Sequence, residues 1–134
     1  MSKSSPDVQS RILLSDEFAQ IQSKIRSAVT DSQLGITFDP VNRPGVSNLV
    51  TILATCTNKS PEEVAEWYAS EGHARLKADT AEAVESLLRQ PREELKRLKA
   101  ETTYLEKIAR DGATRAREIS EATVALVRSQ IGLA

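Results

Sequence analysis

Apolar positions recur every three or four residues along most of the chain, which is the spacing of one face of an α-helix. The first apolar stripe predicts a helix over about 16–30, and its members are Phe18, Ile21, Ile25 and Val29. A second stripe predicts a buried helix from Val46 to Thr57 that ends near Asn58. We therefore expect both segments to bury one face.

The clearest helix start lies at Ser60, which is followed by Pro61 and by Glu63 in a capping-box arrangement. We expect this third helix to end at Gly72. Its inward positions are predicted to be Val64, Trp67 and Tyr68. Packing of the two aromatic residues is favoured over their use as a stacking platform, because Val64 shares their helical face.

A fourth helix is predicted from Leu76 to Leu88, with a kink or break at Pro91, because proline removes a backbone donor and clashes with the preceding turn. The last helix begins at a second capping-box pattern, Thr103 to Glu106, and Gly132 is its expected end. Small residues interrupt its near-heptad stripe at Gly112, Ala113 and Ala116. Such residues allow close approach, so the sequence predicts antiparallel pairing with the fourth helix.

Two segments lack any helical period. The first eleven residues are polar and are expected to form an exposed loop, with neither the apolar core of a secretory signal nor the pattern of a transit peptide. The segment 30–45 carries two prolines and two glycines and is expected to be a long loop. The predicted architecture is an all-α helical bundle preceded by an extended N-terminal arm.

Composition agrees with one small helical domain. The chain has 134 residues, 40% of them hydrophobic and 4% aromatic, and no apolar stretch that could span a membrane. Its net charge of −1 is uneven, because residues 1–88 hold eight Lys or Arg against twelve Asp or Glu, whereas residues 89–134 hold ten against seven. The basic surplus fits either a solvated helix face or contact with an anionic partner.

As an independent enzyme the chain offers little chemistry. There is one histidine, His73, at a predicted helix boundary, and one cysteine, Cys56, which fits a small buried hydrophobe better than a reactive thiol. No metal-ligand spacing is present. The N-terminal segment Ser2–Ser5 places a lysine among hydroxyls, which suits polyphosphate binding but also occurs by chance in polar tails.

Several motifs in order carry a family resemblance. The segment Met1–Asp7 resembles the Lys-Met-Ser-Lys-Ser signature loop of class I aminoacyl-tRNA synthetases, starting one residue late. The downstream segments that continue the match are Lys24–Ser32, Phe38–Pro40, Arg43–Leu49, Leu76–Asp79, Gly112–Arg117 and Ile131–Leu133. Together they resemble the C-terminal part of bacterial and organellar tryptophanyl-tRNA synthetases over essentially the whole chain.

The resemblance implies an enzyme that activates tryptophan with ATP, together with Mg²⁺, and transfers it to tRNA. It assigns the second signature lysine, here Lys3, to the ATP phosphates and the leaving pyrophosphate, with Ser2 and Ser4 shaping the loop or bonding phosphate oxygens. The first signature lysine, the Rossmann fold and the tryptophan pocket have no counterpart in this sequence. We therefore expect this chain alone neither to aminoacylate nor to bind ATP tightly.

The resemblance also divides the chain into a signature loop with linker, residues 1–15, and a helical anticodon-binding domain, residues 16–134. Four residues are candidates for RNA contact, although a solvated surface role stays open for each: Lys77, Asp79, Arg115 and Arg117. The turn Arg43–Asn48 is expected to shape a domain junction rather than to read RNA.

The implied partners are the anticodon arm of tRNA(Trp) and a missing catalytic domain, with no membrane. Members of the family form homodimers, but this chain is expected to be monomeric, in either the mitochondrial matrix or the bacterial cytoplasm. Two other functions remain open from the residues alone. One is a free-standing, non-catalytic helical RNA-binding module, and the other is a structural helix bundle that pairs with another protein through the stripe 105–130.

Overall fold

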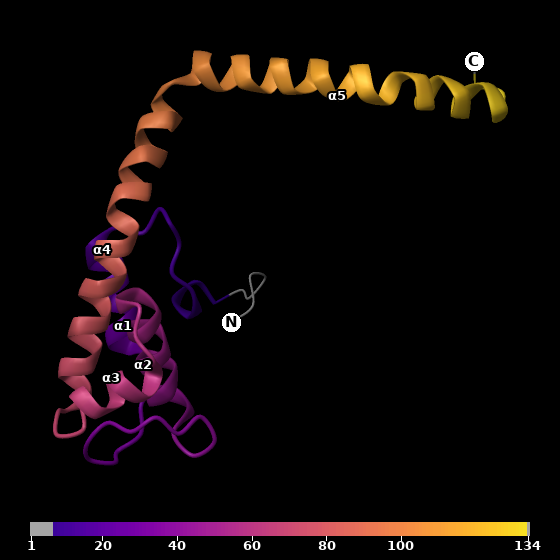
Figure 1. Cartoon of the computed structure of the whole chain (residues 1–134). Helices are drawn as coiled ribbons and strands as arrows, with labels where there is room; N and C mark the ends of the chain where they lie inside the picture. The colour runs from indigo at the N-terminus through magenta and orange to yellow at the C-terminus, as the bar shows by residue number, and fades with distance from the viewer. Residues whose placement is uncertain (1–6, 134) are drawn as a thin grey trace. The chain divides into compact units, whose positions relative to one another are not determined.

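The computed structural model describes residues 7–133, and within them every regular element is a helix. Figure 1 labels the five α-helices in chain order. The elements are the short 3₁₀ helix η1 (Val8–Ser10), α1 (Phe18–Ser27), α2 (Pro44–Thr57), α3 (Pro61–Trp67), α4 (His73–Ala100) and α5 (Thr102–Gln130). The all-α prediction is confirmed. The chain divides into two compact units, one up to Glu93 and one from Glu94.

The first unit contains the hydrophobic core. Helices α1 to α4 each contribute side chains that are almost fully buried, and α2 contacts α3 directly. The largest fully buried side chains are Ile21, Ile36, Leu49, Leu76, Val46, Val50, Val64 and Thr80. The predicted apolar face of α2 is therefore confirmed, and the loop residue Ile36 joins the core beside the helices.

Helix ends in the first unit follow the predicted capping chemistry in part. Ser60 and Glu63 form the expected reciprocal capping box at the start of α3. Helix α2 ends before Asn58, as predicted, and Asn58 adopts a left-handed conformation there, with φ of 55°. Helix α1 is shorter than expected, because Asp16 bonds the Leu13 backbone N–H and leaves Glu17 as N-cap.

The prediction that Trp67 packs inward is wrong. Helix α3 ends at Trp67 rather than at Gly72, and the indole is 59% exposed, with the Lys59 Nζ 5.5 Å from the ring centroid. The neighbouring Tyr68 is the half-buried aromatic residue, and its hydroxyl donates to Asp79. A seven-residue helix has one narrow inward face, which Val64 and Ala65 occupy.

Helix α4 continues through Pro91, so the predicted break is absent. The Arg92 guanidinium donates to the Glu85 carboxylate at 2.6 Å, and Arg89 contacts the same carboxylate at 3.3 Å. These side-chain bonds link the turns before and after the proline. They offset the backbone hydrogen bond that proline removes.

The second unit consists of the end of α4 and helix α5, with the single residue Glu101 between them. No described residue of α5 is buried, and a methyl group at Gly112 would meet nothing within 4 Å. The predicted close antiparallel pairing at Gly112 is therefore wrong. One connecting residue is too few for an antiparallel helix pair, which needs a loop of about two to five residues.

Of the two predicted ends of α5, the start is wrong and the end is confirmed. The expected capping box at Thr103 is wrong, because the helix already begins at Thr102 with Glu101 as N-cap. The expected end near Gly132 is confirmed. Gly132 has φ of +74°, and the Leu133 N–H bonds the Arg128 carbonyl at 2.8 Å, which completes a Schellman motif.

Candidate nucleic-acid interface

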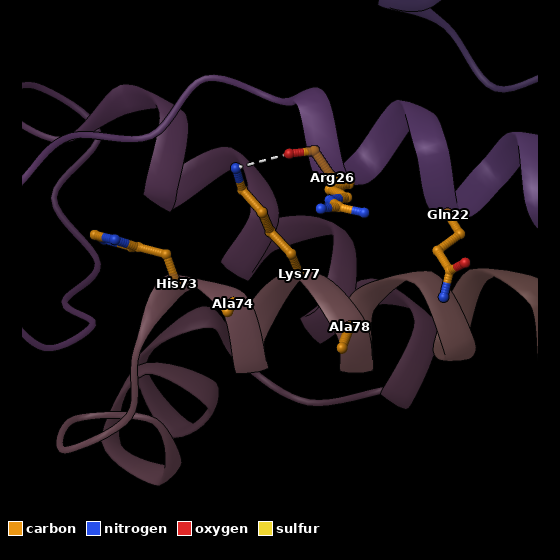
Figure 2. Close-up of a pocket in the computed structure, with 6 residues that line it drawn as sticks. All are labelled: Gln22, Arg26, His73, Ala74, Lys77 and Ala78. Carbon is orange, nitrogen blue, oxygen red and sulfur yellow. Dashed lines mark hydrogen bonds between the residues drawn. The ribbon is translucent and has the colours of Figure 1, made fainter.

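Lys77 joins the end of α1 to the first turns of α4. Its ammonium donates to the carbonyl of Arg26 at 3.1 Å and to the carbonyl of Ala28 at 2.7 Å, and Figure 2 shows the first of these bonds. The last carbonyls of a helix lack backbone partners and carry partial negative charge. The predicted RNA-binding lysine therefore has a structural role, and the third proton of its ammonium remains for a ligand.

A groove of about 550 Å³ lies along this junction between α1 and α4. Figure 2 shows the six residues that line it: Gln22, Arg26, His73, Ala74, Lys77 and Ala78. The lining includes three basic side chains and no carboxylate. The exposed Arg26 guanidinium has no hydrogen bond or ion pair to any residue that the structure describes. The groove is therefore suited to an anionic ligand.

A buried arginine organises the loop beside the groove. The Arg43 side chain is 4% exposed and forms a two-pronged bond to the Asp31 carboxylate, at 2.9 and 2.8 Å. It also donates to the Thr37 hydroxyl and to the Gly35 carbonyl. The Arg43 guanidinium lowers the pKa of Asp31 to about 2, and the same pair raises the pKa of Arg43 above its ordinary range. Arg43 thus fixes the long loop before α2.

The same arginine reaches the groove through His73. The Nε2 atom of His73 lies 3.3 Å from the terminal guanidinium nitrogen of Arg43 and 3.7 Å from the Asp31 carboxylate. His73 is the first residue of α4, so this contact ties the loop to the start of the helix. Residues far apart in sequence therefore set the wall of the groove.

Asp79, the second residue predicted to contact RNA on α4, has two partners in its own chain. Its carboxylate accepts from the Tyr68 hydroxyl at 2.6 Å and from Arg75 at 2.7 Å. Burial and this carboxylate raise the pKa of Tyr68 to about 12. Asp79 is not among the residues that line the groove, and its role in reading RNA stays a prediction.

The other predicted site residues lie elsewhere. Arg115 and Arg117 are exposed on α5, in the second unit, and their contact with RNA stays a prediction. Ser2, Lys3 and Ser4 lie outside the described residues. Among the residues that are described, no group of three or more His, Cys, Asp or Glu could hold a metal ion, and no helix is long and apolar enough to cross a membrane.

Sequence reasoning missed Arg26, Gln22 and His73 as parts of one surface. Arg26 had a usable signal, since it is a basic residue in the last turn of the first helix. No sequence signal pointed to His73, because its partners Arg43 and Asp31 are thirty or more residues away along the chain. Only the fold brings these groups together.

Comparison with known proteins places the chain in a family. A family model described as tRNA synthetases class I (W and Y) matches residues 1–89. Tryptophan–tRNA ligase 1 of Streptomyces avermitilis is 48% identical over 122 residues, which cover 91% of this chain and 36% of that protein. Tryptophan–tRNA ligase of Bacillus subtilis is 38% identical over 133 residues, covering 99% of this chain and 40% of the relative.

The fold has a solved counterpart. The crystal structure of tryptophanyl-tRNA synthetase from Mycoplasma pneumoniae aligns with a TM-score of 0.71 and 27% identity, covering 100% of this chain and 42% of that one. The chain thus spans about two fifths of the length of these relatives. By its family match and by the identity of its relatives, the chain belongs to the class I tRNA synthetases of the tryptophan and tyrosine group.

Proposed function

We propose that this chain is the C-terminal part of a tryptophan–tRNA ligase. In this proposal, residues 1–15 supply a loop whose Lys3, with Ser2 and Ser4, holds the phosphates of Mg²⁺-bound ATP. Residues 16–134 form the helical domain that contacts the anticodon arm of tRNA(Trp), and the catalytic domain is a further partner. Support comes from the ordered motifs, the names of the relatives and the two-fifths coverage of their length.

The groove between α1 and α4 is the observation that carries the RNA-binding part of the proposal. It combines Lys77 with the guanidinium of Arg26, which has no partner among residues 7–133, and no carboxylate lines it. Arginine binds phosphate oxygens through two parallel hydrogen bonds, which a free guanidinium can offer without first breaking an ion pair. Phosphate contacts of this kind position an RNA and leave its bases to be read by nearby residues. Asp79, Arg115 and Arg117 are the proposed further contacts.

The test compares RNA binding by the chain and two single variants. Fluorescence anisotropy would measure the affinity for a tRNA(Trp) transcript and for a transcript with a swapped anticodon, each at two salt concentrations. Arg26→Gln should weaken binding about tenfold and reduce the salt dependence, because one phosphate contact is lost. Lys99→Gln is the matched control, since it removes an exposed charge from the last turn of α4 and Lys99 is not among the residues that line the groove.

Each arm of this test can contradict a different part of the proposal. Equal affinity for both transcripts would contradict anticodon recognition, and equal loss in both variants would contradict the groove as the contact surface. The ATP part needs its own measurement. When the chain is joined to the remainder of a tryptophan–tRNA ligase, Lys3→Ala should slow tryptophan activation and leave tRNA affinity nearly unchanged.

The exposed stripe of α5 favours a second candidate function, pairing of this helix with another protein. Its exposed apolar side chains include Leu105, Ile108, Ile119, Leu126 and Val127. Analytical ultracentrifugation of the chain with and without RNA would separate the candidates. Self-association that persists in Leu126→Glu would contradict pairing through this stripe.

A further inference from the structure

The groove holds one ionisable side chain whose chemistry the proposed function does not use. His73 is the sole histidine of the chain, and it lies at the first position of α4 with a side chain that is 22% exposed. It lines the groove beside Lys77, one turn later on the same helix. A histidine in such a place either fills space or offers a hydrogen bond to a ligand.

The contact with Arg43 decides which ring nitrogen can donate. The guanidinium nitrogen of Arg43 lies 3.3 Å from Nε2, and such a nitrogen donates hydrogen bonds but cannot accept one. Nε2 must therefore accept, and in a neutral imidazole the proton then resides on Nδ1. Arg43 thus selects the tautomer in which Nδ1–H is the donor.

The alternative, a proton on Nε2, fits this geometry poorly. The Asp31 oxygen that would receive it is 3.7 Å away, beyond hydrogen-bond reach, and already accepts from Arg43 at 2.8 Å. A proton on Nε2 would also face the N–H groups of Arg43. The other charged side chains at this groove, Arg26 and Lys77, are both cations. For a neutral ring, this geometry therefore favours the proton on Nδ1.

With this tautomer, the basic side chains of the groove are all hydrogen-bond donors. Arg26 offers a free guanidinium, Lys77 offers one proton that its carbonyl partners leave unused, and His73 offers Nδ1–H. Each of these donors can bond an acceptor of a ligand in the groove, and the two cations favour an anionic oxygen over a neutral acceptor of a base. A phosphodiester of the RNA backbone has these properties.

We propose that His73 is a further RNA-binding residue of this groove, which donates from Nδ1 to a phosphodiester oxygen, and that Arg43 is its positioning residue. The inference rests on the proposed function, because it names a contact within the same RNA site. The proposal names Nδ1 of His73 as the donor and a phosphodiester oxygen as the acceptor, although no sequence motif marks His73.

The first experiment observes the ring directly. In the uniformly ¹⁵N-labelled full chain, the ring nitrogens of the sole histidine give an unambiguous correlation spectrum at mildly alkaline pH, where an imidazole is neutral. We expect the Nδ1–H tautomer in the free chain and a shift of the Nδ1 signal when the tRNA(Trp) transcript is added. An Nε2–H tautomer, or a Nδ1 signal that RNA leaves unchanged, would overturn the inference.

The second experiment separates donation to RNA from packing against Arg43. His73→Asn retains a donor near the position of Nδ1, whereas His73→Gln retains an acceptor near Nε2 for Arg43 but loses that donor. We expect His73→Gln and His73→Ala to weaken RNA binding about five- to tenfold, equally for both transcripts, and His73→Asn to stay within about twofold of the wild type. Thermal unfolding of each variant reports the structural contribution separately.

The outcomes distinguish this inference from the proposed function. If the wild-type chain binds neither transcript, both fail. If it binds and Arg26→Gln weakens binding while His73→Gln does not, only the role of His73 is overturned. A larger loss of affinity in His73→Asn than in His73→Gln would also overturn it, because the ring would then act through the acceptor that it offers to Arg43, which Gln retains and Asn does not.

Discussion

The two helical units of this chain are held together in different ways. In the first unit, the fourteen residues of α2 include six that are buried, and every neighbouring helix contributes to the same core. In the second unit, the 29 residues of α5 include none that is buried. Its ordering relies on local interactions, such as the ion pair between Arg110 and Glu106 one turn apart.

This contrast shows that an apolar stripe alone does not determine packing. Both α2 and α5 carry one, but only the stripe of α2 is covered by neighbouring helices of the core. A helix as long as α5 can form from local hydrogen bonds, whereas one as short as α3 requires tertiary contacts. Substitutions in the two units should therefore have effects of different size.

The largest difference is expected for leucine truncation. Leu76→Ala in α4 removes a side chain that is fully buried in the first unit and should lower the free energy of unfolding by about 2–5 kcal/mol. Leu126→Ala in α5, where the side chain is 59% exposed, should change it by no more than about 0.5 kcal/mol.

Urea unfolding followed by tryptophan fluorescence measures this effect in the first unit, because Trp67 is the sole tryptophan of the chain. Far-UV circular dichroism, followed in parallel, includes α5. A large loss of stability in Leu126→Ala would show that the stripe of α5 is covered in solution, and would remove the distinction between the units.

The sequence predicted the fold where structure depends on neighbouring residues. The capping box at Ser60, the end of the second helix near Asn58 and the end of the last helix near Gly132 were all confirmed, because each depends on residues within one or two turns. The expected break at Pro91 and the expected pairing at Gly112 were wrong because both predictions required knowledge of partners. Glu85 and Arg92 bridge the proline, and no helix approaches the glycine.

The candidate site was predictable to a smaller extent. Lys77 was identified by resemblance and does line the groove, but its bonds to carbonyls of α1 could not be inferred from spacing. The groove depends on a junction between segments about fifty residues apart. The role expected for the Arg43–Asn48 turn at a domain junction stays a prediction, and the contact of Arg43 with His73 arises only in the folded chain.

The second expected difference concerns glycine. A methyl group at Gly45 would clash with the Val29 carbonyl oxygen, which is backbone and cannot move aside without shifting the loop. Gly45→Ala should therefore destabilise the first unit by about 1–3 kcal/mol. Gly112→Ala meets open space within a helix and should instead increase the stability of α5 by about 0.5–1 kcal/mol.

Thermal unfolding by circular dichroism, with Trp67 fluorescence beside it, would detect these opposite signs. Gly45→Ala should lower both midpoints, while Gly112→Ala should raise helix content without changing the fluorescence transition. A stabilising effect at both positions would mean that the loop adapts to the added methyl group. A destabilising effect of both substitutions would instead indicate that another part of the protein packs closely against Gly112.

The smallest expected difference lies in the response to acid. The Arg43 guanidinium lowers the pKa of Asp31 to about 2 from its ordinary 3.8, so the ionised carboxylate stabilises the folded first unit above the higher value. That contribution is lost as the pH falls from 3.8 towards 2, because the unfolded chain takes up the proton first. Asp31→Asn cannot ionise and should show a shallower loss of stability across this interval.

Urea midpoints of the fluorescence transition at a series of acidic pH values would measure that slope. Asp111→Asn is the matched control, since it removes a carboxylate from exposed α5 and leaves the loop around Arg43 intact. Because Asp31 belongs to the loop that holds His73, a shallower slope in Asp31→Asn alone would link acid stability to the groove wall. Identical slopes in all three chains would instead show that the Asp31–Arg43 pair adds no pH-dependent stability, and the first unit would then depend on its apolar core alone.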